Sequence, residues 1–280
     1  MRKLPELIVL IRGGGEVASG IAYRLHLSHI RLCLTEVATP LAVSRGTTFS
    51  EAVFDGVKTI MGVRAELVPA RQEEIYRVWQ QGSIPILIDP EASIKERIKP
   101  DVLVDAIMAK RKTDTKITDA PLVIGVGPGF YAGRDVHIVV ESNHSRNLGG
   151  VILEGEAEKN TGIPVAIGGL TKERVVWSPQ AGIFTSNREI GDSVVAGEVI
   201  GQVGDRPLEA PISGMLRGLI RSGVSVAKGS KLIEVDPVHD RITCNYITAK
   251  MLAIGEGVLK AIMLKTGAPE GKEKTQATNF

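Results

Sequence analysis

Three consecutive glycines, Gly13, Gly14 and Gly15, stand between a run of five apolar residues and a stretch whose apolar side chains recur at helical spacing. The spacing Gly13-x-Gly15-x-x-Ala18 fits the fingerprint in which the first turn of a helix binds a pyrophosphate. Glu36 ends the second predicted strand, 21 residues after Gly15, where a carboxylate would bind ribose hydroxyl groups. The pattern predicts a nucleotide site that favours NAD over NADP. The alternative is that the glycines only pack a helix against a strand.

A second copy of this spacing, Gly127-x-Gly129-x-x-Ala132, is followed by residues that predict a strand. No helix would therefore offer its amides to a phosphate there. Since 31 of the 280 residues are glycine, chance alone produces such matches, and the neighbouring elements must decide between them. They favour the first copy, although the loop with Gly127 and Gly129 would also let its backbone approach a ligand closely.

Charged residues follow a later predicted strand. Asp105 ends that strand, and Lys110, Arg111 and Lys112 come shortly after it. Because ligands of parallel α/β sheets lie at the carboxyl ends of the strands, we expect these side chains near the glycine turn. The three cations would hold an anionic group through charge and forked hydrogen-bond donors. A solvated basic loop is the alternative.

His137 and Glu141 lie four residues apart in a predicted strand, so the two side chains share one face. A histidine beside a carboxylate performs acid–base chemistry or binds a metal. With Asp105, these two residues are the candidate catalytic groups. The alternative is a surface salt-bridge cluster or a hydrogen-bonded core histidine.

The elements that must position these residues divide the chain. Strands and helices alternate over residues 1–118, which predicts an α/β fold with a doubly wound parallel sheet, as in dinucleotide-binding domains. Residues 119–175 are expected to form a β-rich linking region. Residues 241–265 predict a C-terminal helix, softly broken at Gly255 and Gly257, and the polar residues 266–280 predict a disordered tail.

An internal repeat lies between these regions. Gly191-x-Ser-Val-x-x-Gly197 matches Gly223-x-Ser-Val-x-x-Gly229 at an offset of 32 residues. Residues 176–240 thereby resemble the biotinyl/lipoyl barrel, a flattened sandwich of two similar halves. The family carries its cofactor on a lysine at the hairpin between the halves. That hairpin, residues 203–207, has no lysine here, so a scaffold, docking surface or lid is the expected role.

The bulk composition excludes several classes of protein. A net charge of +2 gives no basis for binding nucleic acid or an anionic membrane, and no apolar run has the length of a membrane span. The N-terminus leads directly into a predicted core strand, without a signal peptide. Cys33 and Cys244 are too far apart in sequence to suggest a redox or zinc motif. A cytoplasmic protein is the expectation.

The whole chain resembles the YqeB family, which is associated with selenium-dependent molybdenum hydroxylases. The motifs that carry the resemblance are Gly13-Gly-Gly-Glu-Val-Ala-Ser-Gly20, Val104-Asp-Ala-Ile-Met-Ala-Lys-Arg111, Gly127-Pro-Gly-Phe-Tyr-Ala-Gly133, Asp135-Val-His137, Asn160-Thr-Gly-Ile-Pro164 and Arg217-Gly-Leu-Ile-Arg-Ser-Gly223. The N-terminal part is similar to XdhC-type accessory proteins. The order His144-Ser-Arg146 departs from the Arg-Gly-His order expected of the family.

This resemblance implies an accessory or maturation factor for such a hydroxylase. The ligand would be NAD or a molybdopterin nucleotide, in a crevice between the two parts of the chain, with a pterin phosphate on the basic loop. The implied partners are the hydroxylase or other cofactor-maturation proteins. The apolar side of the C-terminal helix is expected to pack on the core, and a homo-oligomer contact is the alternative. An NAD-dependent oxidoreductase and a non-catalytic docking scaffold are the alternatives.

Overall fold

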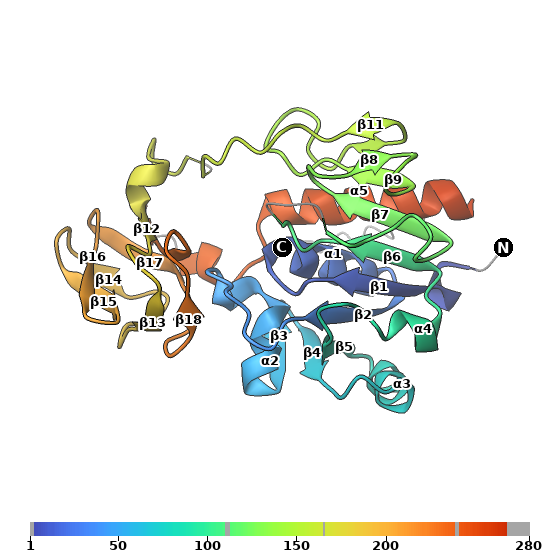
Figure 1. The fold of residues 1–280 in the computed structure, drawn as a ribbon, viewed down its shortest axis with the longest axis horizontal. Helices are drawn as coiled ribbons and strands as arrows, with labels where there is room; N and C mark the ends of the chain where they lie inside the picture. Colours follow the sequence, from blue (N-terminus) through green and yellow to red (C-terminus); the bar gives the residue numbers. More distant parts are fainter. Residues whose placement is uncertain (1–2, 110–112, 165, 239–240, 268–280) are drawn as a thin grey trace, which may run out of the picture.

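The computed structural model describes residues 3–109, 113–164, 166–238 and 241–267. The chain forms an α/β part built on a nine-stranded sheet, with a β-sandwich beside it (Figure 1). The predicted basic loop, Lys110 to Lys112, and the predicted tail from residue 268 onward lie outside the described residues.

The strands of the large sheet follow the order β10-β9-β7-β6-β1-β2-β5-β4-β3. Neighbours pair in parallel from β4 to β9, whereas β3 and β10 run antiparallel to the strands beside them. The sheet is thus mixed and mostly parallel. This confirms the predicted α/β class and corrects the prediction of a wholly parallel sheet. The strands are β1 (Ile8–Arg12), β2 (Arg31–Glu36), β3 (Val57–Ile60), β4 (Val63–Leu67), β5 (Ile84–Ile88), β6 (Val102–Asp105), β7 (Leu122–Val126), β9 (Ile138–Val140) and β10 (Val151–Ile152).

Residues 119–175 are not confined to a separate linking region. Strand β7 pairs in parallel with β6 along its length, and β9 and β10 extend the same sheet. A short second ribbon, β8 (Tyr131–Ala132) with β11 (Gly155–Glu156), comes from the same residues. The large sheet therefore continues well beyond residue 118.

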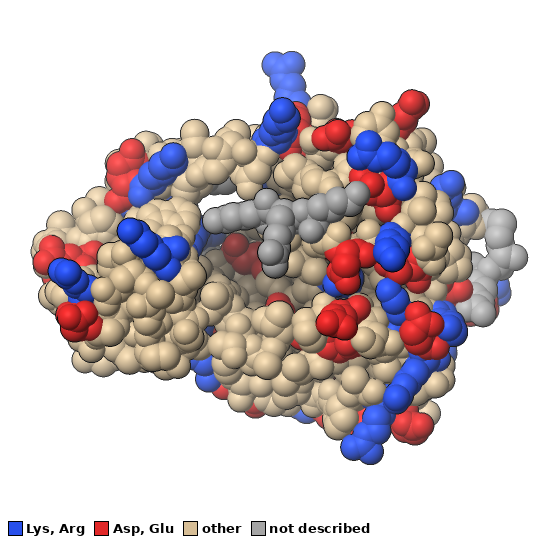
Figure 2. Space-filling view, viewed as in Figure 1, with Lys and Arg blue, Asp and Glu red and all other residues tan. Residues whose placement is uncertain are grey.

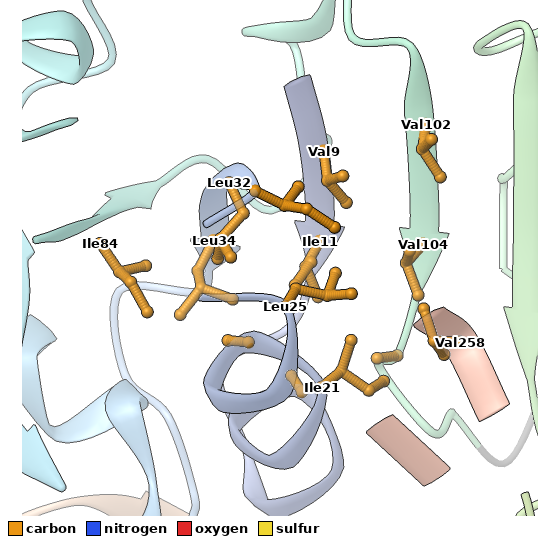
Figure 3. Packing of buried hydrophobic residues seen from close by; sticks show 14 of the residues in the cluster. Val9, Ile11, Ile21, Leu25, Leu32, Leu34, Ile84, Val102, Val104 and Val258 are labelled. Atoms are coloured by element: carbon orange, nitrogen blue, oxygen red, sulfur yellow. The ribbon is translucent and has the colours of Figure 1, made fainter. Parts of the chain in front are cut away.

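Strand β1 lies inside the sheet and is apolar on both faces. Val9 and Ile11 pack against α1 (Glu16–Leu27) and α5 (Ala249–Thr266), as Figure 3 shows with Ile21 of α1 pointing toward the strands. Leu10 belongs to the opposite core, beneath α3 (Gln72–Gln80) and α4 (Lys95–Ile98). A strand buried on both faces requires the continuous apolar run seen in the sequence.

Helices α1 and α5 run side by side in the same direction. An added Cβ on Gly20 would lie 2.6 Å from the carbonyl oxygen of Met251, and one on Gly255 would lie 2.8 Å from that of Gly20. Further along, a Cβ on Gly257 would lie 2.2 Å from the carbonyl oxygen of Gly149. The expected break in the C-terminal helix is wrong, because its glycines serve close packing within one continuous helix.

Shorter helical segments complete the chain. Four-residue α2 (Ala52–Asp55) follows the 3-10 turns η2 (Arg45–Thr47) and η3 (Phe49–Glu51), whereas η1 (Leu4–Glu6), η4 (Lys172–Arg174) and η5 (Arg241–Cys244) connect larger elements. Among the described residues, no helix combines the length and apolar character needed to cross a bilayer.

The β-sandwich consists of two four-stranded sheets, β12-β19-β17-β14 and β16-β15-β13-β18. The repeat offset of 32 residues carries the start of β13 onto β17, of β14 onto β18 and of β15 onto β19. When each strand is replaced by its repeat equivalent, the order of one sheet becomes the order of the other. The short strand of each half, β14 or β18, therefore pairs within the sheet formed mainly by the other half. The strands are β12 (Val175–Trp177), β13 (Gly182–Thr185), β14 (Ser193–Val194), β15 (Val199–Val203), β16 (Arg206–Glu209), β17 (Gly214–Leu219), β18 (Ser225–Val226) and β19 (Lys231–Asp236).

The segment after β2 joins the two parts. The Val43 carbonyl accepts a hydrogen bond from the Leu219 amide at 2.8 Å, and Arg45 Nε donates to the Leu219 carbonyl at 2.6 Å. Arg221 forms ion pairs with Glu51 and Asp55. These contacts attach β17 of the sandwich and the loop after it to the α/β part.

The Gly20→Ala variant is expected to lose about 1–3 kcal/mol of stability, because the added methyl group would force α1 and α5 apart. Gly15→Ala, at the start of the same helix, is the matched control. A methyl group there meets no atom within 4 Å, so its effect should stay within about 1 kcal/mol. Urea unfolding measures both, and equal losses would contradict the packing argument.

Glu234 is buried in β19, with a side chain that is 7% exposed, 3.4 Å from Arg217 and 3.6 Å from Arg174, and it is also paired with Lys231. Desolvation by burial raises the pKa of this carboxyl, but the positive charges of these three neighbours outweigh it and lower the pKa overall. A lowered folded-state pKa stabilises the fold above the unfolded-state pKa. That stabilisation is lost as the pH falls through the folded-state value.

Glu234→Gln is therefore expected to cost about 3–5 kcal/mol at neutral pH, because it leaves buried cations uncompensated. The variant should also lose part of the acid dependence that the wild type shows. Urea unfolding from neutral to acidic pH measures both effects, with Glu209→Gln on the exposed face of β16 as control. A Glu234→Gln variant with wild-type stability at neutral pH would refute the prediction.

Candidate functional site

The candidate site lies where the direction of strand order changes. From β1 the chain proceeds to β2 on one side, and it later returns to β6 on the other. The loops after β1 and β6 therefore diverge at the carboxyl edge, which is where α/β sheets bind ligands. Gly13 has a φ of 103°, and an added Cβ would lie 3.1 Å from the Ala106 carbonyl oxygen, so this turn requires glycine.

A cavity of about 410 Å³ opens above this turn. We call it the glycine cavity; its walls are the glycine turn, the first turn of α1, the end of β2 with residues 37–42, Pro90, and residues 106–108. Its described lining comes entirely from the α/β part, although Ala42 adjoins the segment that contacts the sandwich. Figure 2 shows this face hollowed between the two parts, with acidic side chains in the hollow.

Helix α1 begins at the floor of this cavity. The amides of Glu16, Val17 and Ala18 belong to the first helical turn and have no acceptor within the helix. Ala18 is fully buried against the core, whereas Gly15 has an ordinary φ of −69° and open space where a Cβ would stand. The turn thus leaves room beside free N–H groups, the environment that binds a phosphate.

Glu36 lines the same cavity and is already engaged with the backbone. Its Oε1 accepts from the Gly14 amide at 3.0 Å, and its Oε2 accepts from the Val37 amide at 2.6 Å. Desolvation by burial raises the pKa of this carboxyl, whereas these two hydrogen bonds act in the opposite direction. A carboxylate offers about four lone-pair positions, so Glu36 retains acceptor capacity for a pair of hydroxyl groups.

Asp105 does not line the glycine cavity. Its carboxylate is 1% exposed and accepts hydrogen bonds from Thr113 Oγ1, Thr115 Oγ1 and the Ile107 amide, at 2.8, 2.6 and 3.2 Å. Arg12, at the end of β1, donates to Thr115 Oγ1 at 2.6 Å. This network fastens the segment that follows β6 to the sheet edge, which is a structural use of the predicted catalytic acid.

His137 and Glu141 lie at opposite ends of the same strand, β9 (Ile138–Val140). His137 precedes β9, and its Nδ1 accepts from the Val123 amide at 3.0 Å, near the start of β7. Desolvation by burial lowers the pKa of this histidine, and the charge of Lys265 acts in the same direction. The shared strand face was expected to bring the pair together, but four residues of extended chain span roughly 13 Å.

Glu141 follows β9 at the same edge as the glycine turn, but it too is occupied. Its carboxylate accepts from the amides of Asn143 and Glu158, at 2.6 and 2.7 Å, and it is 2% exposed. It therefore ties two loops together. The described residues contain no cluster of three or more histidine, cysteine or acidic side chains that could hold a metal ion.

The second glycine loop is a tight turn between strands. Gly127 has a φ of 74°, its amide donates to the Val140 carbonyl, and an added Cβ would lie 2.5 Å from Ser142 Oγ. Gly129 has a φ of 109° and open space around it. Strands rather than a helix follow this loop in the chain, as the sequence predicted.

A second cavity, of about 460 Å³, adjoins the first and was not predicted from the sequence. We call it the polar cavity because most of its lining side chains are polar: Ser142, Asn143, His144, Glu158, Asn160, Thr161 and Lys250. Val17 and Met108 line both cavities, so the two are contiguous. The polar residues come from the loops after β9 and β11 and from the first turn of α5.

The chain is thus an α/β protein with two contiguous cavities at the carboxyl ends of its parallel strands and an attached β-sandwich. The chain is 41% identical over 257 residues to the "Uncharacterized protein YqeB" of Escherichia coli (strain K12), an alignment that covers 92% of this chain and 47% of that protein. The chain is therefore a homologue of YqeB, which confirms the family resemblance, and it spans about half the length of that relative. No protein-family model matches it.

Similarity to solved structures is weak. A succinylglutamate desuccinylase/aspartoacylase from Rhodobacter sphaeroides matches with 24% identity and a TM-score of 0.22, over 33% of this chain and 31% of that one. An aspartoacylase family protein from Mesorhizobium loti matches with 13% identity and a TM-score of 0.26, over 82% and 84% of the two chains. Scores this low do not establish a common fold.

Proposed function

We propose that this protein binds a nucleotide or a nucleotide-bearing cofactor in the glycine cavity. The observation that carries the proposal is the convergence, at the point where the strand order reverses, of a glycine turn, a free helix start and Glu36 around one cavity. The ribose would use the remaining acceptor capacity of Glu36. The phosphate of the nucleotide would lie beside Gly15 and the amides of the first turn of α1.

In the cell, this binding would serve the maturation of a molybdenum hydroxylase, with a molybdopterin nucleotide or NAD as ligand. The support is the family resemblance of the whole chain, together with a cavity suited to the nucleotide portion. The catalytic role once expected of Asp105, His137 and Glu141 receives no support, since the three side chains are dispersed and hydrogen-bonded within the fold. Binding and presentation of a cofactor need no such group.

Gly15→Leu is expected to weaken nucleotide binding at least tenfold, because the new side chain would project into the space above the glycine turn without strain in the backbone. Calorimetric titration with NAD, ATP, CTP and CMP measures the binding. Arg31→Leu, at the opposite edge of the same sheet, is the control. Absence of binding by the wild type to all four nucleotides would refute the proposal.

The same variant tests the cellular role. In a host strain that lacks this chain, the molybdenum hydroxylase should be inactive, and wild-type protein but not Gly15→Leu should restore its activity. Restoration by both proteins would point instead to a docking scaffold. Consumption of NADH by the purified protein with a small substrate would favour an oxidoreductase.

Glu36→Gln is expected to weaken binding of nucleotides about tenfold, since the amide has a single acceptor oxygen where the carboxylate has two. Burial raises the pKa of Glu36, so wild-type binding should decline as the pH falls through that raised value and the carboxylate becomes protonated. The variant should lack this part of the pH dependence. Titrations at several pH values test this, with Glu73→Gln, at an exposed position of α3, as control. Identical pH profiles for the wild type and Glu36→Gln would show that Glu36 does not bind the nucleotide.

A further inference from the structure

Two side chains of the polar cavity have no hydrogen-bond or ion-pair partner among the described residues. Within the residues that the structure describes, neither Lys250 nor His144 makes a hydrogen bond or an ion pair, although both line the cavity wall. Other side chains there are only partly used. Asn160 Oδ1 accepts from the Gly162 amide, which leaves its NH₂ group free, and Thr161 Oγ1 accepts from the Ile163 amide, which leaves its O–H free to donate.

Lys250 occupies a position that its own helix disfavours. It lies in the first turn of α5, where the helix dipole is positive, and that turn contains no acidic residue. The side chain is half-buried rather than extended into solvent. A cation held there without a partner is unfavourable for the helix, whereas an anion bound in the cavity would compensate both the charge and the dipole.

The boundary between the cavities lies where a phosphate is expected. Val17 lines both cavities and belongs to the first turn of α1, where the phosphate of a nucleotide in the glycine cavity would lie. A group attached to that phosphate would extend past Val17 and Met108 into the polar cavity. Each cavity, at about 410 and 460 Å³, lies in the range of small-molecule sites, and a mononucleotide would fill one of them.

The charges of the two cavities also differ. Glu16 and Glu36 line the glycine cavity, and its described lining contains no lysine or arginine. In the described lining of the polar cavity, Lys250 is the cation, and the carboxylate there, Glu158, already accepts hydrogen bonds from Asn143 Nδ2 and Ser145 Oγ. This distribution favours the hydroxyl-rich nucleoside in the first cavity and directs negative charge toward the second.

Building on the proposed function, we propose that the ligand is a nucleotide joined through a diphosphate to a second polar group. The nucleoside lies against Glu36, and the diphosphate crosses the boundary at Val17 and pairs with Lys250. The second group, a sugar or a polar heterocycle, lies among His144, Asn160 and Thr161, whose free donors match its oxygen and nitrogen atoms. The polar cavity is thus a subsite that selects diphosphate-linked compounds over mononucleotides.

Calorimetric titration of the full chain with two matched pairs of compounds tests this proposal: AMP against ADP-ribose, and CMP against CDP-glucose. In at least one pair, the diphosphate-linked compound is expected to bind roughly tenfold or more tightly than its mononucleotide, the contribution of a charge-assisted contact. Lys250→Glu should remove most of this advantage. Because glutamate suits a helix start, the variant should remain folded.

Lys260→Glu, an exposed position on the same helix, is the control and should leave every affinity unchanged. A second variant, Thr161→Phe, narrows the polar cavity and should weaken only the diphosphate-linked compounds. If the mononucleotides bind and their partners bind no more tightly, or if both variants leave the advantage intact, the subsite is refuted while the proposed function stands. If none of the four compounds binds, the proposed function fails and the subsite with it.

Discussion

Backbone contact between two parallel helices is the constraint on which the candidate site depends. Gly20 and Gly255 let α1 and α5 approach more closely than any side chain would allow, so both helices pack on the same face of the sheet. Helix α1 must begin at the carboxyl edge, because it follows β1 directly. Being parallel to it, α5 also begins there, and this brings Lys250 beside a cavity that α1 already borders.

The two cavities differ in the chemical groups that they offer to a ligand. The glycine cavity combines apolar walls with Glu36, a carboxylate whose position is set by the amides of Gly14 and Val37. The polar cavity supplies a cation and uncommitted hydrogen-bond donors. The buried carboxylates of Asp105 and Glu141 accept hydrogen bonds from the loops near the two cavities and thereby hold these loops in place. Burial and full hydrogen bonding suit these two acids to rigidity rather than to proton transfer.

Features set by neighbours in sequence were predictable, and features assembled from distant segments were not. The strand, the turn at Gly13 and the helix after it follow from local patterning, and the repeat predicted a sandwich of two similar halves, although not the exchange of strands between its sheets. Parity placed His137 and Glu141 on one face, but the rise of four strand residues separates the two side chains to opposite ends of β9. The glycines of α5 resembled helix breakers because their packing partners, Gly20 and Gly149, are remote in sequence.

The proposed function requires that a nucleotide bind over the glycine turn. The most direct test is the change in backbone amide chemical shifts of isotope-labelled protein on titration with ADP-ribose and CDP-glucose. If a nucleotide binds there, the largest changes will occur at residues 15–18 and at Val37, with smaller changes at Lys250. Changes confined to the β-sandwich, or no saturable change at the start of α1, would contradict it.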